Sequence, residues 1–318
     1  MPIAVFLDLL LGDPRLPWPH PVCLVGRFLN AQERLWRHIC AGSAVAERAS
    51  GLFAVFLTAG MVASAAYLLV CIPVLGPALA IYLAWAGLAM GCLLDTGREV
   101  IGRVESADIL CARTGVGWLV SRDVCGMERP VLRKTLADTL SENFTDAFVA
   151  PCFWLTVGGP VALWAYKAVS TMDSQWGYLT SEWRNLGNAA ARSDDVLAWL
   201  PARLSVFILW FTNWLATLFP ALKSWQGEWP GFRRIRRDAG GMPSPNSGWS
   251  MAACAWLAGG RMAGPSVYFG KIVHKGWIGP PGEWTRSKLL QLCRLMFMGS
   301  IIGAVLLWIS CLVICFVV

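Results

Sequence analysis

The sequence predicts an all-α integral membrane protein, a polytopic helical bundle of about four to six membrane segments with helical cytoplasmic loops. Apolar residues make up 56% of the 318 residues, and charged residues only 15%. The mean hydropathy is +0.52. Several apolar runs approach the roughly 20 residues that cross a bilayer as a helix. These runs lack the alternation of barrel strands, so helices must satisfy their backbone in lipid.

Each membrane segment is predicted from one apolar run. The runs are, in chain order, Leu52–Val70, Val74–Leu94, Ala147–Tyr166, Val196–Phe219 and Leu292–Val318. The last is the strongest, because it is uncharged after Arg294. Pro2–Leu11 is apolar but too short to span, which leaves two readings. It is either an interfacial helix or a first span that is shortened at its start.

The run Ala147–Tyr166 contains Gly158-Gly159-Pro160 at its middle. Glycine followed by proline interrupts helices. One reading is a kinked helix that crosses the membrane. The other is a re-entrant hairpin of two half-helices, which returns Lys167 to the side of the membrane where the run begins. Non-helical backbone at membrane depth requires burial in protein or a wet cavity.

The net charge of +7 is concentrated between the apolar runs. Basic residues cluster in segments 95–146 and 220–291, which are therefore expected to face the cytoplasm. No stretch is long enough to bury an independent soluble core, so residues 1–318 are expected to form one membrane domain. The basic residues either set topology and contact anionic lipid, or also bind anionic substrates. The eleven cysteines show no metal-binding spacing and are interpreted as reduced, small apolar residues.

A loop helix is predicted over residues 128–148, with Pro130 in its first turn. Glu142 and Asp146 are one turn apart on the stripe that also carries Thr135 and Thr139. Two readings remain for this stripe: a solvated polar face, or a pair of carboxylates that bind a metal ion.

Further polar motifs stand at the ends of the other apolar runs. On a helix, Lys167 and Ser174 share one face, and Asp173 lies close to it. Charged residues so near an apolar run are costly and usually functional. We expect all these motifs to converge on one cavity at the cytoplasmic face. The remaining members are His20, Arg122, Asn143, Arg192, Asp194, Asp195, Ser244 and Asn246.

Six stretches in this order resemble the adenosylcobinamide-phosphate synthases of cobalamin biosynthesis. They are LDLLLGDPRLPWPHPVCLVGR at 7–27, LVSRDV at 119–124, TLSENFTDAFVAPCFW at 139–154, GGPVALWAYKAVSTMDSQWGY at 158–178, AARSDDVLAWLPARL at 190–204 and MPSPNSGWSMAACAWLAGGRMAGPSVYFG at 242–270. Two departures stand out. The family usually has a longer apolar helix before the stretch Asp8–Pro14. The acidic stretch that commonly follows Asp123 is replaced by Cys125–Pro130.

The resemblance implies a carbon–nitrogen ligase of the inner (plasma) membrane. The family joins the free propionate of adenosylcobyric acid to the amine of aminopropanol phosphate, or of ethanolamine phosphate in some lineages, and uses ATP and Mg²⁺. The lipid bilayer and other cobalamin-assembly enzymes are expected partners, and nucleic acid is not. A transporter, or a membrane sensor or scaffold without catalysis, is the alternative. A transporter would show internal repeats and charges deep within several spans.

The residue types suggest roles in this chemistry. Carboxylates and substrate oxygens hold Mg²⁺, which makes Glu142, Asp146 and Asp173 the first metal candidates, followed by Asp194 and Asp195. Cationic side chains bind phosphate, and the candidates are Lys167, Arg122 and Arg192. A carboxylate or His20 is the expected general base, and the predicted catalytic residues are Glu142, Asp146, Lys167, Asp173 and His20. Asn143, Ser174, Ser244 and Asn246 are expected to bind substrate, and loop hydrogen bonding is the alternative for the amides and Ser244.

Overall fold

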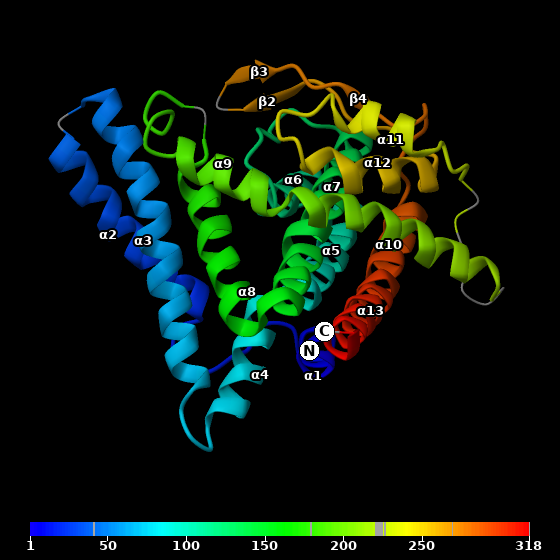
Figure 1. Ribbon diagram of the computed structural model, residues 1–318. Coiled ribbons are helices and arrows are strands. Elements are labelled where there is room, and N and C mark those ends of the chain that lie inside the picture. Colours follow the sequence, from blue (N-terminus) through cyan, green and yellow to red (C-terminus); the bar gives the residue numbers. More distant parts are fainter. Residues whose placement is uncertain (41, 179, 220–224, 226, 269, 318) are drawn as a thin grey trace. The chain divides into compact units, whose positions relative to one another are not determined.

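A computed structural model describes residues 1–40, 42–178, 180–219, 225, 227–268 and 270–317 (Figure 1). Helices dominate the described chain. Their bounds are α1 Pro2–Leu11, α2 Pro21–Cys40, α3 Ala44–Val70, α4 Gly76–Gly87, α5 Met90–Val104, α6 Ile109–Gly117, α7 Arg129–Phe144, the π-helical turn η1 Thr145–Val149, α8 Ala150–Trp176, α9 Asn188–Leu197, α10 Trp199–Thr217, α11 Phe232–Ala239, α12 Ser247–Ala258 and α13 Arg286–Val317. The strands are β1 Met262–Ala263, β2 Ser266–Tyr268, β3 Lys271–Val273 and β4 Trp277–Ile278.

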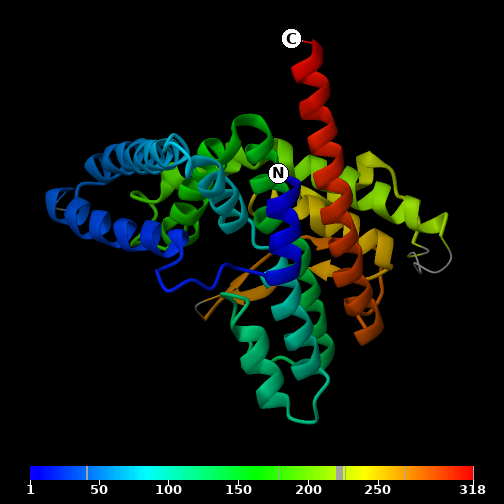
Figure 2. The same ribbon diagram turned by 90° about the horizontal axis from the view of Figure 1, so that it is seen from below.

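Four helical stretches of the described chain are long and apolar enough to cross a membrane. They are Ala44–Val70, Gly76–Val104, Arg129–Trp176 and Arg286–Val313. The pair α9 and α10 meets the same criterion only when its two helices are taken together, which makes five. The prediction of a polytopic helical membrane protein is therefore confirmed. Figure 2 shows α13 as one continuous helix, as expected for the strongest apolar run.

The chain forms two compact units. The first unit comprises Met1–Ala89, Ala150–Ala198 and Ala304–Val318, and the second comprises Met90–Val149 and Trp199–Gly303. In the first unit α2 and α3 lie side by side (Figures 1 and 2). Leu29 of α2, Ala54 of α3 and Met172 of α8 are fully buried in one apolar core.

Helix α8 folds back on itself at the glycines that the sequence singles out. Gly158 and Gly159 have non-helical backbone angles, and Gly159 has φ of 64°. Trp154 and Tyr166 stand on opposite sides of this break, yet their rings stack with centroids 6.4 Å apart. Twelve residues of straight α-helix would separate them by about 18 Å. The two arms of α8 therefore form a hairpin, as the second reading of Ala147–Tyr166 expects.

Helix α7 carries most of the predicted site of the second unit. It begins at Arg129 with Pro130 in its first turn, as predicted. Its burial differs from the amphipathic pattern, because Thr135 and Thr139 are as buried as the leucines opposite them. A solvated polar face is therefore wrong for this helix. The π-helical turn η1 follows directly and contains Asp146, and such turns often accompany functional sites.

Two short antiparallel ribbons, which the sequence analysis did not identify, follow α12. Met262 of β1 pairs with Ile278 of β4, and Ser266 of β2 pairs with Val273 of β3. Ala263 has φ of 58°, a left-handed conformation that is uncommon for a residue with a Cβ atom. These ribbons bring the segment after α12 to helix α7.

Candidate functional site

A buried carboxylate, Asp138, organises the polar residues of the second unit. The Nη1 atom of Arg122 donates to Asp138 Oδ2 at 2.9 Å, and the Nζ atom of Lys134 donates to the same oxygen at 3.1 Å. The main-chain N–H of Ala263 donates to Oδ1 at 3.0 Å. The side chain of Asp138 is 0% exposed and that of Arg122 is 6% exposed. The carboxylate thus ties α7, the loop before it and β1 together, and we call these four residues the Asp138 cluster.

The local backbone fixes Arg122 in this place. The N–H of Asp123 donates to the carbonyl of Val267 in β2 at 2.9 Å, which anchors the loop. Burial by itself would lower the pKa of Arg122, but the charge and hydrogen bond of Asp138, with Tyr268 and Glu142, raise it above the ordinary value. The guanidinium therefore stays charged although it is buried.

Glu142 lies one turn beyond Asp138 on α7 and is half-buried. Its charged neighbours include Lys275 and Arg122. Lys275 also donates to the hydroxyl of Tyr268 at 2.6 Å and lies over its ring. Two cations beside Glu142 suit an anionic substrate group better than a third cation such as Mg²⁺.

The other predicted residues of the second unit have identifiable contacts. Asn143 donates its amide N–H to the carbonyl of Thr139 at 2.9 Å, so the amide nitrogen is used within α7. Asn246 accepts at Oδ1 from Arg203, 2.8 Å away, and the Ser244 hydroxyl accepts from the N–H of Asn246. Ser244 and Asn246 thus take part in the loop hydrogen bonding that was the alternative to substrate binding.

In the first unit, His20 lies among charged residues. Asp13 and Lys167 are its charged neighbours, and burial is the main cause that lowers its pKa below the ordinary value. Its Nδ1 atom accepts from the N–H of Val22 at 3.3 Å. In a neutral imidazole this bond assigns the proton to Nε2. Nε2 is buried and has no hydrogen-bond partner in the described part of the chain. In this tautomer the Nε2–H of His20 is available to donate to the oxygen of a ligand.

Asp173 and Asp195, on α8 and α9, are electrostatic neighbours in the first unit. The hydroxyl of Ser174 donates to the carbonyl of Ser170 at 2.9 Å, within α8. Gly177 follows α8 closely, and a Cβ atom there would collide with Oδ1 of Asp173. Glycine at 177 thereby leaves room for the Asp173 carboxylate.

Among the described residues, no group of three or more histidine, cysteine, aspartate or glutamate side chains is placed to hold a metal ion. Mg²⁺ is commonly bound by only one or two protein carboxylates together with substrate phosphates. The pair of Asp173 and Asp195 fits that pattern. Glu142 fits it less well because of its cationic neighbours. Asp194 lies on α9 with Asp195, and Asp146 lies in η1.

The sequence analysis missed Asp138, Lys134, Tyr268 and Lys275. A signal for the first two was present, because Lys134, Asp138 and Glu142 recur at four-residue spacing and so share one helix face. Tyr268 and Lys275 gave no such signal. Their proximity depends on the ribbon pairing of β2 with β3.

Comparison with known proteins covers nearly the whole chain. The model of the family described as CobD/Cbib protein matches residues 1–296. A cobalamin biosynthesis protein CobD of Photorhabdus laumondii is 36% identical over 284 residues, which are 87% of this chain and 85% of the relative. A protein of the same name from Pelobacter propionicus is 35% identical over 96% of this chain and 92% of its own. A cobalamin biosynthesis protein CbiB of Salmonella typhimurium is 32% identical over 96% of this chain and 94% of the relative. No solved structure matches.

Proposed function

The chain belongs to the CobD/CbiB protein family of cobalamin biosynthesis, and from that premise we propose that it is an adenosylcobinamide-phosphate synthase. It joins the free propionate of adenosylcobyric acid to the amine of aminopropanol phosphate or ethanolamine phosphate. The observation that carries the proposal is the extent of the family match. It covers residues 1–296 and so includes every predicted site residue.

The reaction requires activation of the carboxylate, because a carboxylate does not acylate an amine spontaneously in water. The propionate oxygen attacks the γ-phosphorus of ATP, and ADP leaves. The amine then attacks the carbonyl carbon of the acyl phosphate, inorganic phosphate leaves, and the amine loses a proton. Mg²⁺, when bound, neutralises charge on the transferred phosphoryl group.

The second unit supplies cations and a carboxylate for this chemistry. Arg122 and Lys275 bind an anionic group of the substrates, because both are charged neighbours of one half-buried position on α7. Glu142 accepts the proton from the attacking amine. We prefer Glu142 to His20 as the base, since the Nε2 atom of His20 already carries a proton in the assigned tautomer.

The first unit supplies the groups that suit a magnesium nucleotide. Asp173 and Asp195 would hold Mg²⁺ together with phosphate oxygens of the nucleotide, and the ion would neutralise phosphate charge there. Lys167 and the Nε2–H of His20 act as donors to phosphate or carboxylate oxygens. The protein acts in the inner membrane with its site open to the cytoplasm.

Reconstitution in lipid nanodiscs tests the proposed reaction. The protein is incubated with adenosylcobyric acid, Mg-ATP and either aminopropanol phosphate or ethanolamine phosphate, and mass spectrometry detects the amide. We expect one amide and one ADP per turnover, and the faster of the two amines identifies the substrate. Active relatives run in parallel control the assay. If they form amide and this chain forms none with either amine, the proposal fails.

A further inference from the structure

A largely apolar cavity in the first unit lies outside the groups assigned above. Its volume is about 530 Å³, within the range of roughly 300–1,000 Å³ typical of ligand sites. Helices α3, α8 and α9 line it. The α8 hairpin builds one wall, since Trp154 and Tyr166 come from its two arms and stack on each other.

The helices that line this cavity and its exposed apolar side chains indicate that it opens toward lipid. Helix α3 and the stretch containing α8 are both candidate membrane spans. Phe56 of α3 and Val196 of α9 line the cavity and are 71% and 73% exposed. Large apolar side chains exposed on membrane helices contact acyl chains.

One charged side chain, Arg192, interrupts the apolar lining. It is exposed, and within the described part of the chain it forms no ion pair or hydrogen bond through its guanidinium. Two other arginines of this unit do have side-chain partners: Arg37 pairs with Glu33, and Arg48 donates to Asn185. A free guanidinium beside an apolar cavity is complementary to a ligand with an anionic head and an apolar tail.

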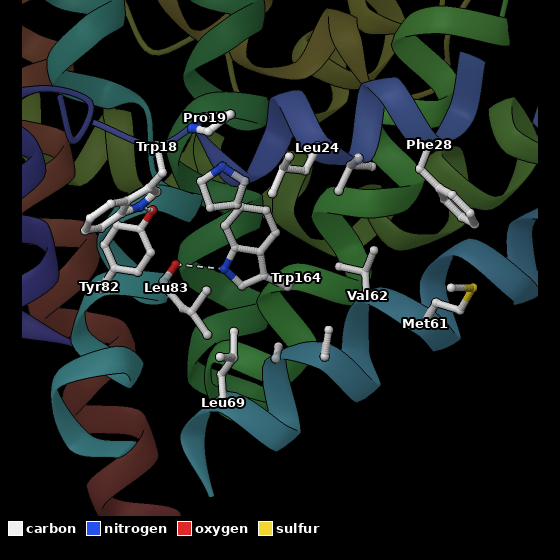
Figure 3. Close-up of a pocket in the computed structure, with 14 residues that line it drawn as sticks. Trp18, Pro19, Leu24, Phe28, Met61, Val62, Leu69, Tyr82, Leu83 and Trp164 are labelled. Atoms are coloured by element: carbon white, nitrogen blue, oxygen red, sulfur yellow. Dashed lines mark hydrogen bonds between the residues drawn. The ribbon is translucent and has the colours of Figure 1, made fainter. Parts of the chain in front are cut away.

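A second cavity of the same unit provides a contrast. Its volume is about 410 Å³, and α2, α3, α4 and α8 line it (Figure 3). None of its lining residues is charged. Its polar groups bond to one another: Trp164 donates to the carbonyl of Leu83 at 2.9 Å, and Trp18 donates to the hydroxyl of Tyr82 at 3.2 Å. This second cavity therefore has no cationic side chain that could bind an anionic head group.

We propose that the cavity beside Arg192 is a binding site for an anionic phospholipid. The phosphate of the lipid pairs with the guanidinium of Arg192, and one acyl chain lies along the apolar wall formed by α3 and α8. A small free anion is a poor occupant, because most of the lining is apolar and would remove water from the anion. The proposal stands independently of the reaction proposed above.

Native mass spectrometry of the detergent-purified full chain tests this site with phosphatidylglycerol as the probe. A hydrogen bond to a charged group is strong enough that Arg192→Gln should weaken binding about tenfold. Arg192→Lys should keep part of the affinity. Ala165→Phe, which fills the cavity without changing charge, should weaken binding to a similar extent. Arg184→Gln is the matched control, because Arg184 is also an exposed arginine of this unit but does not line the cavity.

Three further ligands identify what is bound. Diacylglycerol lacks the phosphate, so it should bind more weakly and be insensitive to Arg192→Gln. Millimolar inorganic phosphate or ethanolamine phosphate should not displace the lipid. Displacement by either anion would show a small-anion site and overturn the proposal. Equal binding of diacylglycerol and phosphatidylglycerol, or equal loss in Arg184→Gln, would overturn it as well.

Discussion

At the residue scale, Asp138 is a fully buried carboxylate that pairs with two cations, Arg122 and Lys134. Removing its charge takes the hydrogen-bonded carboxylate away from the buried guanidinium of Arg122. Breaking a buried pair in this way costs about 3–5 kcal/mol. We therefore expect Asp138→Asn to lower the thermal unfolding midpoint of the purified protein strongly. Asp95→Asn is the matched control, because Asp95 pairs with Arg98 at 75% exposure and such a pair is worth about 0–1 kcal/mol. Equal midpoints for the two variants would contradict the account of the cluster.

His20 makes stability depend on pH. Burial lowers its pKa in the folded state below the ordinary 6.5, so folding disfavours the protonated form. Neutral His20 therefore makes its full contribution to the free energy of unfolding above pH 6.5. This contribution is lost as the pH falls from 6.5 through the pKa of the folded state, because over that range only the unfolded chain takes up the proton. Unfolding midpoints measured from pH 7.5 to pH 5 should fall more steeply for the wild type than for His20→Gln. Parallel curves would show that His20 does not titrate as inferred.

At the element scale, the hairpin of α8 depends on backbone angles that glycine adopts freely. Gly159 has φ of 64° and ψ of −159°, a conformation that costs other residues about 1–3 kcal/mol, and nothing lies within 4 Å of the Cβ that alanine would add. Gly159→Ala should therefore destabilise the protein through the backbone alone. Gly60→Ala in the middle of α3 is the control, since its Cβ also meets nothing and helical alanine is favoured over glycine. Equal changes in stability for Gly159→Ala and Gly60→Ala would show that the hairpin does not depend on the backbone angles of Gly159.

The helices could be predicted from the sequence to a greater extent than the site. The predicted apolar runs of about bilayer length correspond to the four candidate spans and to the bent pair of α9 and α10. They could be predicted because the bilayer sets the length and composition of each helix separately. The four-residue spacing of Lys134, Asp138 and Glu142 indicates a shared helix face, but the same spacing occurs whether that face is exposed or buried. The burial of Asp138 depends on Arg122, and on the N–H of Ala263 at a distance of 125 positions along the chain. Pairings of that kind are not visible in local periodicity.

At the scale of the whole molecule, we propose that this chain joins a carboxylate to an amine at the expense of ATP. The measurement that tests this most directly starts from adenosylcobyric acid with ¹⁸O in the free propionate. The amine displaces phosphate from the acyl phosphate, so the account predicts one ¹⁸O atom in the inorganic phosphate for each amide formed. Amide formation with unlabelled phosphate, or labelled substrate that returns unchanged with ATP intact, would contradict it.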